Sequence, residues 1–528
     1  MKNVCLVTLM AALLMAPPVM SAKPKPTEAV VNIASGRIRG ARSGGLLVFK
    51  GIPYAQAPVG DLRWRPPQPV KPWEDVKAAL NFGHDCMQLP FPGDAAPLRT
   101  QPSEDCLYIN IWTPRKHGEK PLPVLVWIYG GGFVNGGTSP AVYSGEQFAR
   151  RGLVFVSFNY RLGRFGFFAF PALDQGDGPV GNYAFMDQIA ALHWVQENIA
   201  AFGGDPHQVT IFGESAGGAS VNVLLTSPMS RGLFQRAIVE SGGGRDTILR
   251  PKALDHPGER GQTSAEQDGI AFAKHMGIEG TDEAAVAALR QLPAEKIVND
   301  LNMASMFRQR DIYSGPMVDG KVIVQSAEQA FKEGKQAEVA VITGANSADI
   351  GFTSAQTAEE LFAPFGAKAG AARAAFDPQH DGKFKAVAQQ VGQVEDMIEP
   401  ARFVARRVAA GGQAAYEYRF SYVATRLRKK FGGAPHSSEI PYVFDTIRES
   451  MWSDFGKGIK RQDLRTARQM NVYWVNFAKT GDPNGPGLPQ WPKISAEGDQ
   501  LLNFTAKGPK AETDPWRAQL DLVESMQP

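Results

Sequence analysis

The chain has 528 residues, of which 43% are hydrophobic and 21% are charged. This balance is ordinary for a soluble globular protein and argues against a disordered or fibrous chain. Lysine and arginine number 56 against 53 aspartates and glutamates, a net charge of +3, and no basic run is long enough to follow a nucleic-acid backbone. We therefore expect no nucleic-acid partner.

The N-terminus has the pattern of a secretory signal peptide. Lys2 precedes an apolar stretch over residues 4–16, and small residues follow at Ser21 and Ala22. The stretch has 16 − 4 + 1 = 13 residues, fewer than the roughly 20 that span a bilayer core, and no later segment is longer. We expect residues 1–22 to direct export to the periplasm or the medium and the mature protein to be soluble, with a retained membrane anchor as the alternative.

Two cysteines remain after the signal peptide. Cys86 and Cys106 are 106 − 86 = 20 residues apart. In an exported protein such a pair predicts one disulfide, with two buried free thiols as the alternative. No group of cysteines and histidines has the spacing of a metal site, because the eight histidines are scattered. We expect neither a metal nor a cofactor.

Buried strands alternate with helices through the middle of the chain. Residues 30–50 predict an antiparallel entry hairpin, and apolar positions every three or four residues over 183–199 predict an amphipathic helix. Strands that alternate with helices predict a doubly wound α/β sheet. The helical patterns of 242–335 and 355–430 predict excursions that cover the carboxyl edge of this sheet. The predicted buried strands are 124–128, 153–156, 209–212, 237–239 and 339–343.

Ser215 lies in the sequence Gly-Glu-Ser-Ala-Gly at 213–217, between a predicted strand and a segment compatible with a helix. Glycines on both sides leave room for a tight turn from which the hydroxyl projects. This context predicts a nucleophile elbow, whereas the glycine pattern alone also fits an ordinary small-residue turn.

An oxyanion hole is predicted at 129–133, Tyr-Gly-Gly-Gly-Phe, which directly follows the strand 124–128. Backbone N–H groups stabilise the tetrahedral oxyanion of acyl transfer, and glycines let the backbone approach the substrate. We expect the donors to be the N–H groups of Gly131, Gly132 and Ala216. A flexible loop is the alternative, and a phosphate cradle is disfavoured because no Gly-Lys-Ser/Thr follows.

His436 is the predicted general base. A serine hydroxyl is weak at neutral pH, and in this arrangement the acid and then the histidine follow the serine in the chain. That order excludes every histidine before Ser215. Of the later ones, His256 and His275 lie in a helical stretch and His380 in a turn, whereas His436 follows the loop 432–435, Gly-Gly-Ala-Pro.

Asp349 is the predicted acid, which orients the imidazole and stabilises its cation. It follows the buried strand 339–343 by a few residues. A capping or turn aspartate is the alternative role for Asp349. Glu395 and Asp396 are rival acids that lie in a helical stretch.

Ordered stretches along nearly the whole mature chain resemble the type-B carboxylesterase and cholinesterase family of the α/β-hydrolase superfamily. The resemblance implies one catalytic domain over residues 23–528, a disulfide between Cys86 and Cys106, and a gorge that leads to the serine. It implies hydrolysis of carboxylic esters through an acyl-enzyme, with a triad of Ser215, Asp349 and His436. The stretches are 49–55, Phe-Lys-Gly-Ile-Pro-Tyr-Ala; 103–110, Ser-Glu-Asp-Cys-Leu-Tyr-Ile-Asn; 159–163, Asn-Tyr-Arg-Leu-Gly; 202–206, Phe-Gly-Gly-Asp-Pro; and 474–481, Trp-Val-Asn-Phe-Ala-Lys-Thr-Gly.

The chain departs from the family pattern in two ways. The family usually has glutamate followed by glycine where this chain has Asp349-Ile350, so the acid is one methylene shorter. Cholinesterases carry a choline-binding tryptophan in the loop closed by the first disulfide, and residues 86–106 contain none. A cation–π site for quaternary ammonium is therefore not supported, and a general carboxylesterase fits better.

Three other functions are alternatives, and the complete triad argues against the third. An amidase and an acyltransferase would use the same acyl-enzyme, and relatives of this fold that lost the serine are non-catalytic binding or adhesion proteins. The sequence does not define the acyl and alcohol groups of a substrate. Four basic residues could attract acidic substrates or form a solvated loop: Arg426, Arg428, Lys429 and Lys430.

Overall fold

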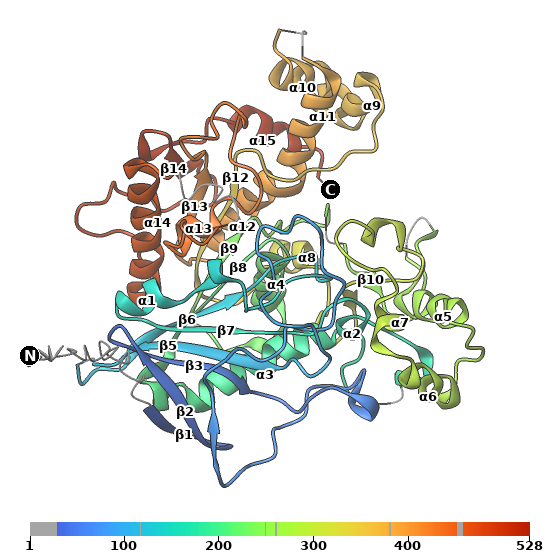
Figure 1. The fold of residues 1–528 in the computed structure, drawn as a ribbon. Coiled ribbons are helices and arrows are strands. Elements are labelled where there is room, and N and C mark those ends of the chain that lie inside the picture. The colour runs from blue at the N-terminus through green and yellow to red at the C-terminus, as the bar shows by residue number, and fades with distance from the viewer. Residues whose placement is uncertain are drawn as a thin grey trace, which may run out of the picture.

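One large mixed sheet runs through the chain from end to end (Figure 1). The computed structural model describes residues 29–527, except 117, 175, 177, 249, 259–260, 380–381 and 451–457. The signal peptide predicted at 1–22 lies outside the described residues. The predicted fold class, an α/β sheet with helices on both faces, is confirmed.

The centre of the sheet is parallel. Val124 of β6 pairs with Val154 of β7 on one side and with Val209 of β8 on the other. After β6 the chain adds β7 on one side and then β8 on the other, so the direction of strand order reverses at β6. In open α/β sheets, ligands bind beyond the carboxyl ends of the strands at such a reversal. The central strands, in spatial order, are β7 (Val154–Phe158), β6 (Leu122–Ile128), β8 (Gly204–Glu214), β9 (Arg236–Glu240), β12 (Ala340–Asn346), β13 (Ala415–Phe420) and β14 (Gln500–Thr505).

Antiparallel strands extend the sheet at both edges. Beyond β7 lie β5, β3, β2 and β1, and beyond β14 lies β15. A short strand, β4, pairs with β2, while β10 and β11 form a separate parallel pair. These strands are β1 (Ala29–Ile33), β2 (Gly36–Ser43), β3 (Leu46–Pro53), β4 (Val76–Ala78), β5 (Tyr108–Pro114), β10 (Lys252–Ala253), β11 (Met317–Val318) and β15 (Gly508–Thr513).

Helices cover both faces of the sheet (Figure 1). On one face, Phe148 of α1 and Phe444 after α13 both pack on Phe212 of β8, with ring centroids 5.8 and 5.6 Å away. On the other face, Gln188 of α3 donates a hydrogen bond to Ser220 of α4. The first face carries α1 (Glu146–Arg150), α13 (Ile440–Val443) and α14 (Arg461–Thr480), and the second α3 (Tyr183–Asn198), α4 (Ala216–Thr226), α8 (Ala327–Lys332) and α12 (Glu399–Ala410).

Two helical excursions leave the sheet where the sequence predicts them. The first contains α5 to α7, and the second contains α9 to α11, which project from the body together and pack around an apolar cluster of their own (Figure 1). A π-helical turn, η9 (Val394–Ile398), joins α11 to α12. The remaining helices are α2 (Gly163–Gly166), α5 (Ala265–His275), α6 (Glu283–Gln291), α7 (Ala294–Val298), α9 (Ala358–Phe362), α10 (Ala369–Phe376), α11 (Phe384–Gln393) and α15 (Arg517–Glu524).

Strand β13 was not predicted as a strand, because it lies within the stretch 355–430 that reads as helical. Charged Glu417 and Arg419 interrupt its aromatic residues, so the segment lacks the continuous apolar run of a central strand. Both side chains are nonetheless buried, and Arg419 forms an ion pair of 2.8 Å with Asp514. A distant partner therefore allows a charged sequence to occupy the interior of the sheet.

Candidate active site

Ser215 lies between β8 and α4, at the carboxyl end of a central strand. Its backbone has φ +57° and ψ −124°, a conformation that non-glycine residues rarely adopt. A Cβ on Gly217 would lie 2.0 Å from the carbonyl oxygen of Ile128, and one on Gly213 would lie 2.5 Å from the Gly217 backbone. Both glycines are therefore required for the turn to pack against the neighbouring strand, as in a nucleophile elbow.

The hydroxyl of Ser215 lies in hydrogen-bond contact with His436. The distance from Ser215 Oγ to His436 Nε2 is 2.8 Å, although the two residues are 221 positions apart. On the other side of the ring, His436 Nδ1 lies 2.5 Å from Asp349 Oδ1. The structure thus brings the three residues predicted from the sequence into one chain of hydrogen bonds, in which Nδ1 donates to the carboxylate and Nε2 faces the serine.

Two loops hold His436 in this position. Asn346, the last residue of β12, donates through its side-chain amide to the carbonyl oxygen of Pro435 at 2.7 Å. The backbone N–H of Ala348 donates to the carbonyl of Ala434, and the N–H of Ala434 donates to Ser347 Oγ. The loop that carries the acid and the loop that carries the histidine are therefore joined directly, so their relative position does not depend on the side chains of Asp349 and His436 alone.

Asp349 is almost fully buried and accepts four hydrogen bonds. Besides His436, the donors are Ser241 Oγ at 2.7 Å and the N–H groups of Asn346 and Ile350, both at 2.8 Å. Burial alone would raise the pKa of Asp349, but His436 and the hydrogen bonds from Ser241 and Asn346 hold this pKa below its ordinary value. Asp349 is therefore ionised at neutral pH.

A second carboxylate approaches His436 from the serine side. Glu214 Oε1 lies 3.2 Å from His436 Nε2 and accepts a hydrogen bond of 2.6 Å from Ser437 Oγ. Burial would lower the pKa of His436, but the charges of Glu214 and Asp349 outweigh it and raise this pKa above its ordinary value. Burial, with Glu214 and Asp349 nearby, raises the pKa of Glu439 to about 8, so Glu439 is mostly neutral at pH 7.

The predicted oxyanion donors follow the strands β6 and β8. Gly131 and Gly132 have φ of +106° and +62°, which glycine adopts without strain. Among the residues that the structure describes, the N–H groups of Gly131, Gly132 and Ala216 donate no hydrogen bond. Three N–H groups that donate no hydrogen bond within the described protein are available to an oxyanion formed at Ser215.

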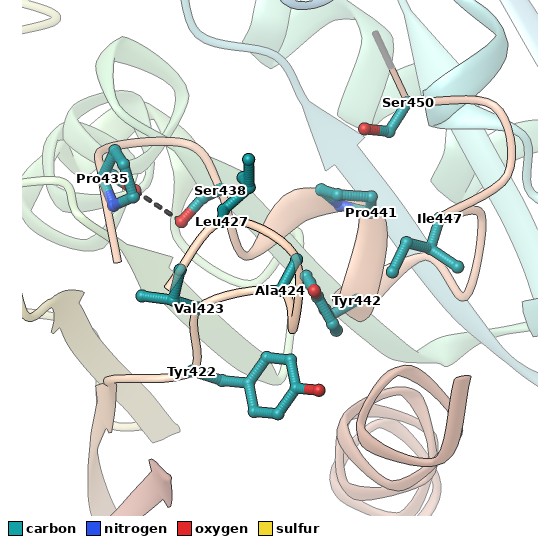
Figure 2. Close-up of a pocket in the computed structure, with 10 residues that line it drawn as sticks. All are labelled: Tyr422, Val423, Ala424, Leu427, Pro435, Ser438, Pro441, Tyr442, Ile447 and Ser450. Atoms are coloured by element: carbon teal, nitrogen blue, oxygen red, sulfur yellow. Dashed lines mark hydrogen bonds between the residues drawn. The ribbon is translucent and has the colours of Figure 1, made fainter. Parts of the chain in front are cut away.

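A cavity of about 230 Å³ opens above Ser215 and His436. Gly130 and Gly131 form one wall, and residues 93–96 of the loop between the two cysteines form another. No lysine or arginine lines it in the described part of the chain, whereas Asp94 and Glu214 do. A mostly apolar pocket lies next to it, behind α13, and shares Pro441 and Ser450 with it (Figure 2).

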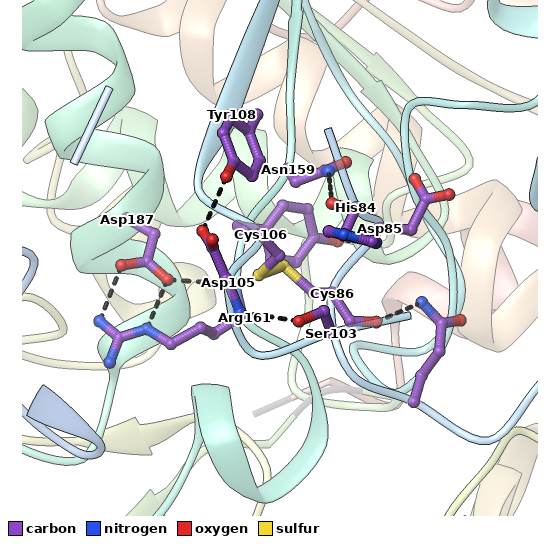
Figure 3. The surroundings of a disulfide bond; sticks show 12 residues. His84, Asp85, Cys86, Ser103, Asp105, Cys106, Tyr108, Asn159, Arg161 and Asp187 are labelled. Atoms are coloured by element: carbon purple, nitrogen blue, oxygen red, sulfur yellow. Dashed lines mark hydrogen bonds and ion pairs between the residues drawn. A yellow bond between two sulfur atoms is a disulfide. The ribbon is translucent and has the colours of Figure 1, made fainter. Parts of the chain in front are cut away.

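The disulfide Cys86–Cys106 closes the loop that borders this cavity. Its surroundings are held by polar contacts between distant segments (Figure 3). Asn159 donates through Nδ2 to the carbonyl of His84 at 2.8 Å, and Arg161 forms a buried ion pair of 2.7 Å with Asp187. The stretches 103–110 and 159–163, which carry much of the family resemblance, thus contain Cys106 of this disulfide and Asn159, which holds the chain at His84.

Sequence reasoning missed Glu214 and Ser241, whose side chains contact the triad, and Ser437, whose hydroxyl donates to Glu214. Glu214 lies inside the predicted elbow, and Ser241 directly follows β9. Because parallel strands end at the same edge of a sheet, a polar residue after β9 could have been suspected. Glu395 and Asp396, the rival acids, lie in η9, and Asp396 accepts a hydrogen bond from the N–H of Phe352 rather than from His436.

The described residues contain no group of three or more histidine, cysteine, aspartate or glutamate side chains arranged to hold a metal ion. No helix in the described ranges combines the length and the apolar character that a membrane span needs.

Known proteins resemble this chain along almost its full length. The model of the carboxylesterase family matches residues 27–375 and 375–522. A fumonisin B1 esterase of Sphingopyxis macrogoltabida is 34% identical over 507 residues, which cover 92% of this chain and 88% of that protein. A para-nitrobenzyl esterase of Bacillus subtilis is 33% identical over 494 residues, which cover 90% of this chain and 94% of that protein. Carboxylesterase 1E of Mus musculus is 34% identical over 494 residues, which cover 84% of this chain and 84% of that protein.

The fold and the comparisons together define a serine hydrolase of the α/β-hydrolase class that acts on carboxylic esters. The chain belongs to the carboxylesterase family.

Proposed function

We propose that Ser215 is the nucleophile of this esterase, that His436 is its general base and that Asp349 orients His436. The observation that carries the proposal is the continuous hydrogen-bond chain from Ser215 Oγ through the His436 ring to Asp349, with distances of 2.8 and 2.5 Å. Nucleophilic catalysis requires a base within hydrogen-bond distance of the nucleophile and a third group that orients the base.

The reaction proceeds through an acyl-enzyme. Ser215 Oγ attacks the ester carbonyl carbon while its proton passes to His436 Nε2. The carbonyl oxygen becomes an oxyanion that accepts hydrogen bonds from the N–H groups of Gly131, Gly132 and Ala216. The intermediate expels the alcohol, which takes the proton from His436. Water then attacks the acyl group with the same base, and the carboxylic acid and free Ser215 are released.

The charges around the cavity favour uncharged esters. Asp94 and Glu214 line the cavity, and no lysine or arginine does so in the described part of its wall. A carboxylate on the substrate would be repelled at short range in this partly dry site. The basic residues 426–430 do not line this cavity, and Arg428 instead lies over the Tyr422 ring at 5.3 Å. Uncharged esters are thus the substrates that this cavity accommodates best.

We further propose that residues 1–22 direct export and that residues 23–528 fold as one catalytic domain. The apolar stretch at 4–16 and the disulfide support export, because disulfides persist in oxidising compartments. A single sheet that begins with β1 at residue 29 and ends with β15 at residue 513 supports one domain.

The pH dependence of ester turnover tests His436 as the base. Only the neutral imidazole accepts a proton, and the raised pKa of His436 makes that form scarce at low pH. We expect kcat/KM for a neutral ester such as phenyl acetate to increase with pH, with a midpoint above the ordinary histidine value of about 6.5. Replacing Glu214 by glutamine removes a carboxylate 3.2 Å from Nε2 and lowers the pKa of His436. The midpoint is then expected about one pH unit lower.

The matched control is Glu279→Gln, which removes an exposed carboxylate away from the cavity and leaves the profile unchanged. Absence of turnover of phenyl acetate would contradict the proposed mechanism as a whole. A midpoint that moves to higher pH in Glu214→Gln would contradict the role of His436 as the base.

A further inference from the structure

A second cavity, of about 500 Å³, lies outside the catalytic cavity and shares no lining residue with it. It is bordered by β3, β5, α1 and α14 and by the segment 445–449. The hydroxyl of Thr446, in its wall, donates to the carbonyl of Val142, which lines the catalytic cavity. The two cavities are therefore neighbours, because a lining residue of one is hydrogen-bonded to a lining residue of the other.

Basic side chains converge on the second cavity from separate parts of the fold. Lys50 comes from β3, Arg99 from the disulfide loop and Arg468 from α14, while Arg151 and Arg448 come from loops. A run of charges along one exposed helix face would be ordinary surface. Here the cations come from segments as far apart in the sequence as residues 50 and 468, and the fold brings them together around one hollow.

The carboxylates of the cavity do not neutralise these cations. Glu146 is held by Arg150 at 2.5 Å, and Asp445 by Arg151 at 2.9 Å. Glu449 is the remaining acidic group in the lining. Within the described ranges, no carboxylate lies within ion-pair distance of the four other basic residues, Lys50, Arg99, Arg448 and Arg468. The lining therefore carries five basic and three acidic side chains, an excess of two positive charges.

Lys50 is half-buried, whereas Arg99, Arg448 and Arg468 are exposed at the rim of the cavity. Its ammonium lies 4.2 Å from the centroid of the Phe82 ring and 5.6 Å from that of Trp112. The rings attract the cation but provide no counter-charge. Burial and the nearby charge of Arg99 lower the pKa of Lys50. This environment therefore destabilises the charged form of the Lys50 ammonium. An anion in the cavity would relieve both effects.

We propose that this cavity is a binding site for a small polyvalent anion, one that presents two or more carboxylate or phosphate groups to Lys50, Arg99, Arg448 and Arg468. Arginine matches both groups through paired N–H donors, and ammonium through its charge. A single negative charge would leave part of the positive excess unpaired, so the site selects polyvalent over monovalent anions. This site is independent of the proposed catalytic function.

Isothermal titration calorimetry of the full-length protein at constant ionic strength tests the proposal. The probes are citrate and inorganic pyrophosphate, with acetate as the monovalent control. We expect saturable binding of at least one polyvalent probe and none of acetate. The double variant Lys50→Met/Arg468→Gln should weaken this binding by tenfold or more, because two of the four unpaired cations are removed. Glu449→Gln should strengthen it, by about threefold, because the unpaired carboxylate of the cavity is removed.

The matched control is Lys71→Met/Arg115→Gln, which removes the same two charges from exposed positions outside the cavity. It separates binding in the cavity from attraction by net charge. Phenyl acetate turnover shows that each variant is folded. The proposal is overturned if neither polyvalent probe binds, if the cavity variant and the control variant weaken binding equally, or if Glu449→Gln weakens it.

Discussion

Replacing Ser215 by alanine is expected to lower kcat for phenyl acetate by on the order of a millionfold. The acyl-enzyme cannot form without the hydroxyl, and His436 is left with no proton to accept. The oxyanion donors and the cavity remain, so a small residual rate above that of water is expected. Steady-state kinetics with purified enzyme, after subtraction of spontaneous hydrolysis, give this ratio.

Ser220→Ala is the control for this variant. Ser220 is a buried serine on α4, about one turn after the elbow, and its hydroxyl donates to the carbonyl of Ala216. Its loss removes two buried hydrogen bonds, to Ala216 and from Gln188, but no reacting group, so activity should stay within about tenfold of the wild type. Near-normal turnover in Ser215→Ala would remove Ser215 from the mechanism.

The second large effect is expected at the acid. Asp349→Asn should lower kcat by about ten-thousandfold, the scale seen when the acid of such a triad becomes an amide. An amide that donates toward His436 Nδ1 favours the tautomer with the proton on Nε2, which cannot accept a proton from Ser215. Ser241 and the N–H group of Asn346 already donate to Oδ2 of Asp349. The asparagine oxygen is therefore needed at the Oδ2 position, and the side chain cannot rotate to place this oxygen beside His436.

Asp396→Asn is the matched comparison. Asp396 is also a buried aspartate, and it accepts hydrogen bonds from the N–H of Phe352 and from the side chain of Thr247. An asparagine oxygen preserves the contact with Phe352, so we expect kcat to fall by less than about tenfold. The same assay on both variants decides between the two acids, and equal losses of turnover would exclude Asp349 from the triad.

The sequence predicts those parts of the site that are formed by residues close together along the chain. The strand, the glycines and the serine of the elbow lie within β8 and the first turn of α4, so their pattern is visible along the chain. The same holds for the glycines after β6. For Asp349 and His436 the sequence offers an order and a loop position, and the structure brings both side chains within hydrogen-bond distance of each other.

Contacts between distant segments could not be predicted in this way. Ser241 lies in no motif that indicates a functional role, and only the pairing of β9 with β12 brings it to Asp349. Glu214 was visible, but its approach to His436 depends on a loop 222 residues later. Strand β13 was missed for the same reason, because the buried charge of Arg419 is explained only by Asp514 in the C-terminal region.

The most direct test of the account is to identify the residue that a fluorophosphonate or other organophosphate ester labels. Such a reagent phosphorylates an activated serine hydroxyl and does not react with an ordinary one. We expect one label per active molecule, located by peptide mass spectrometry on Ser215, with complete loss of ester turnover. Full turnover after labelling, or a label on another residue that accounts for the loss of activity, would contradict the proposed mechanism.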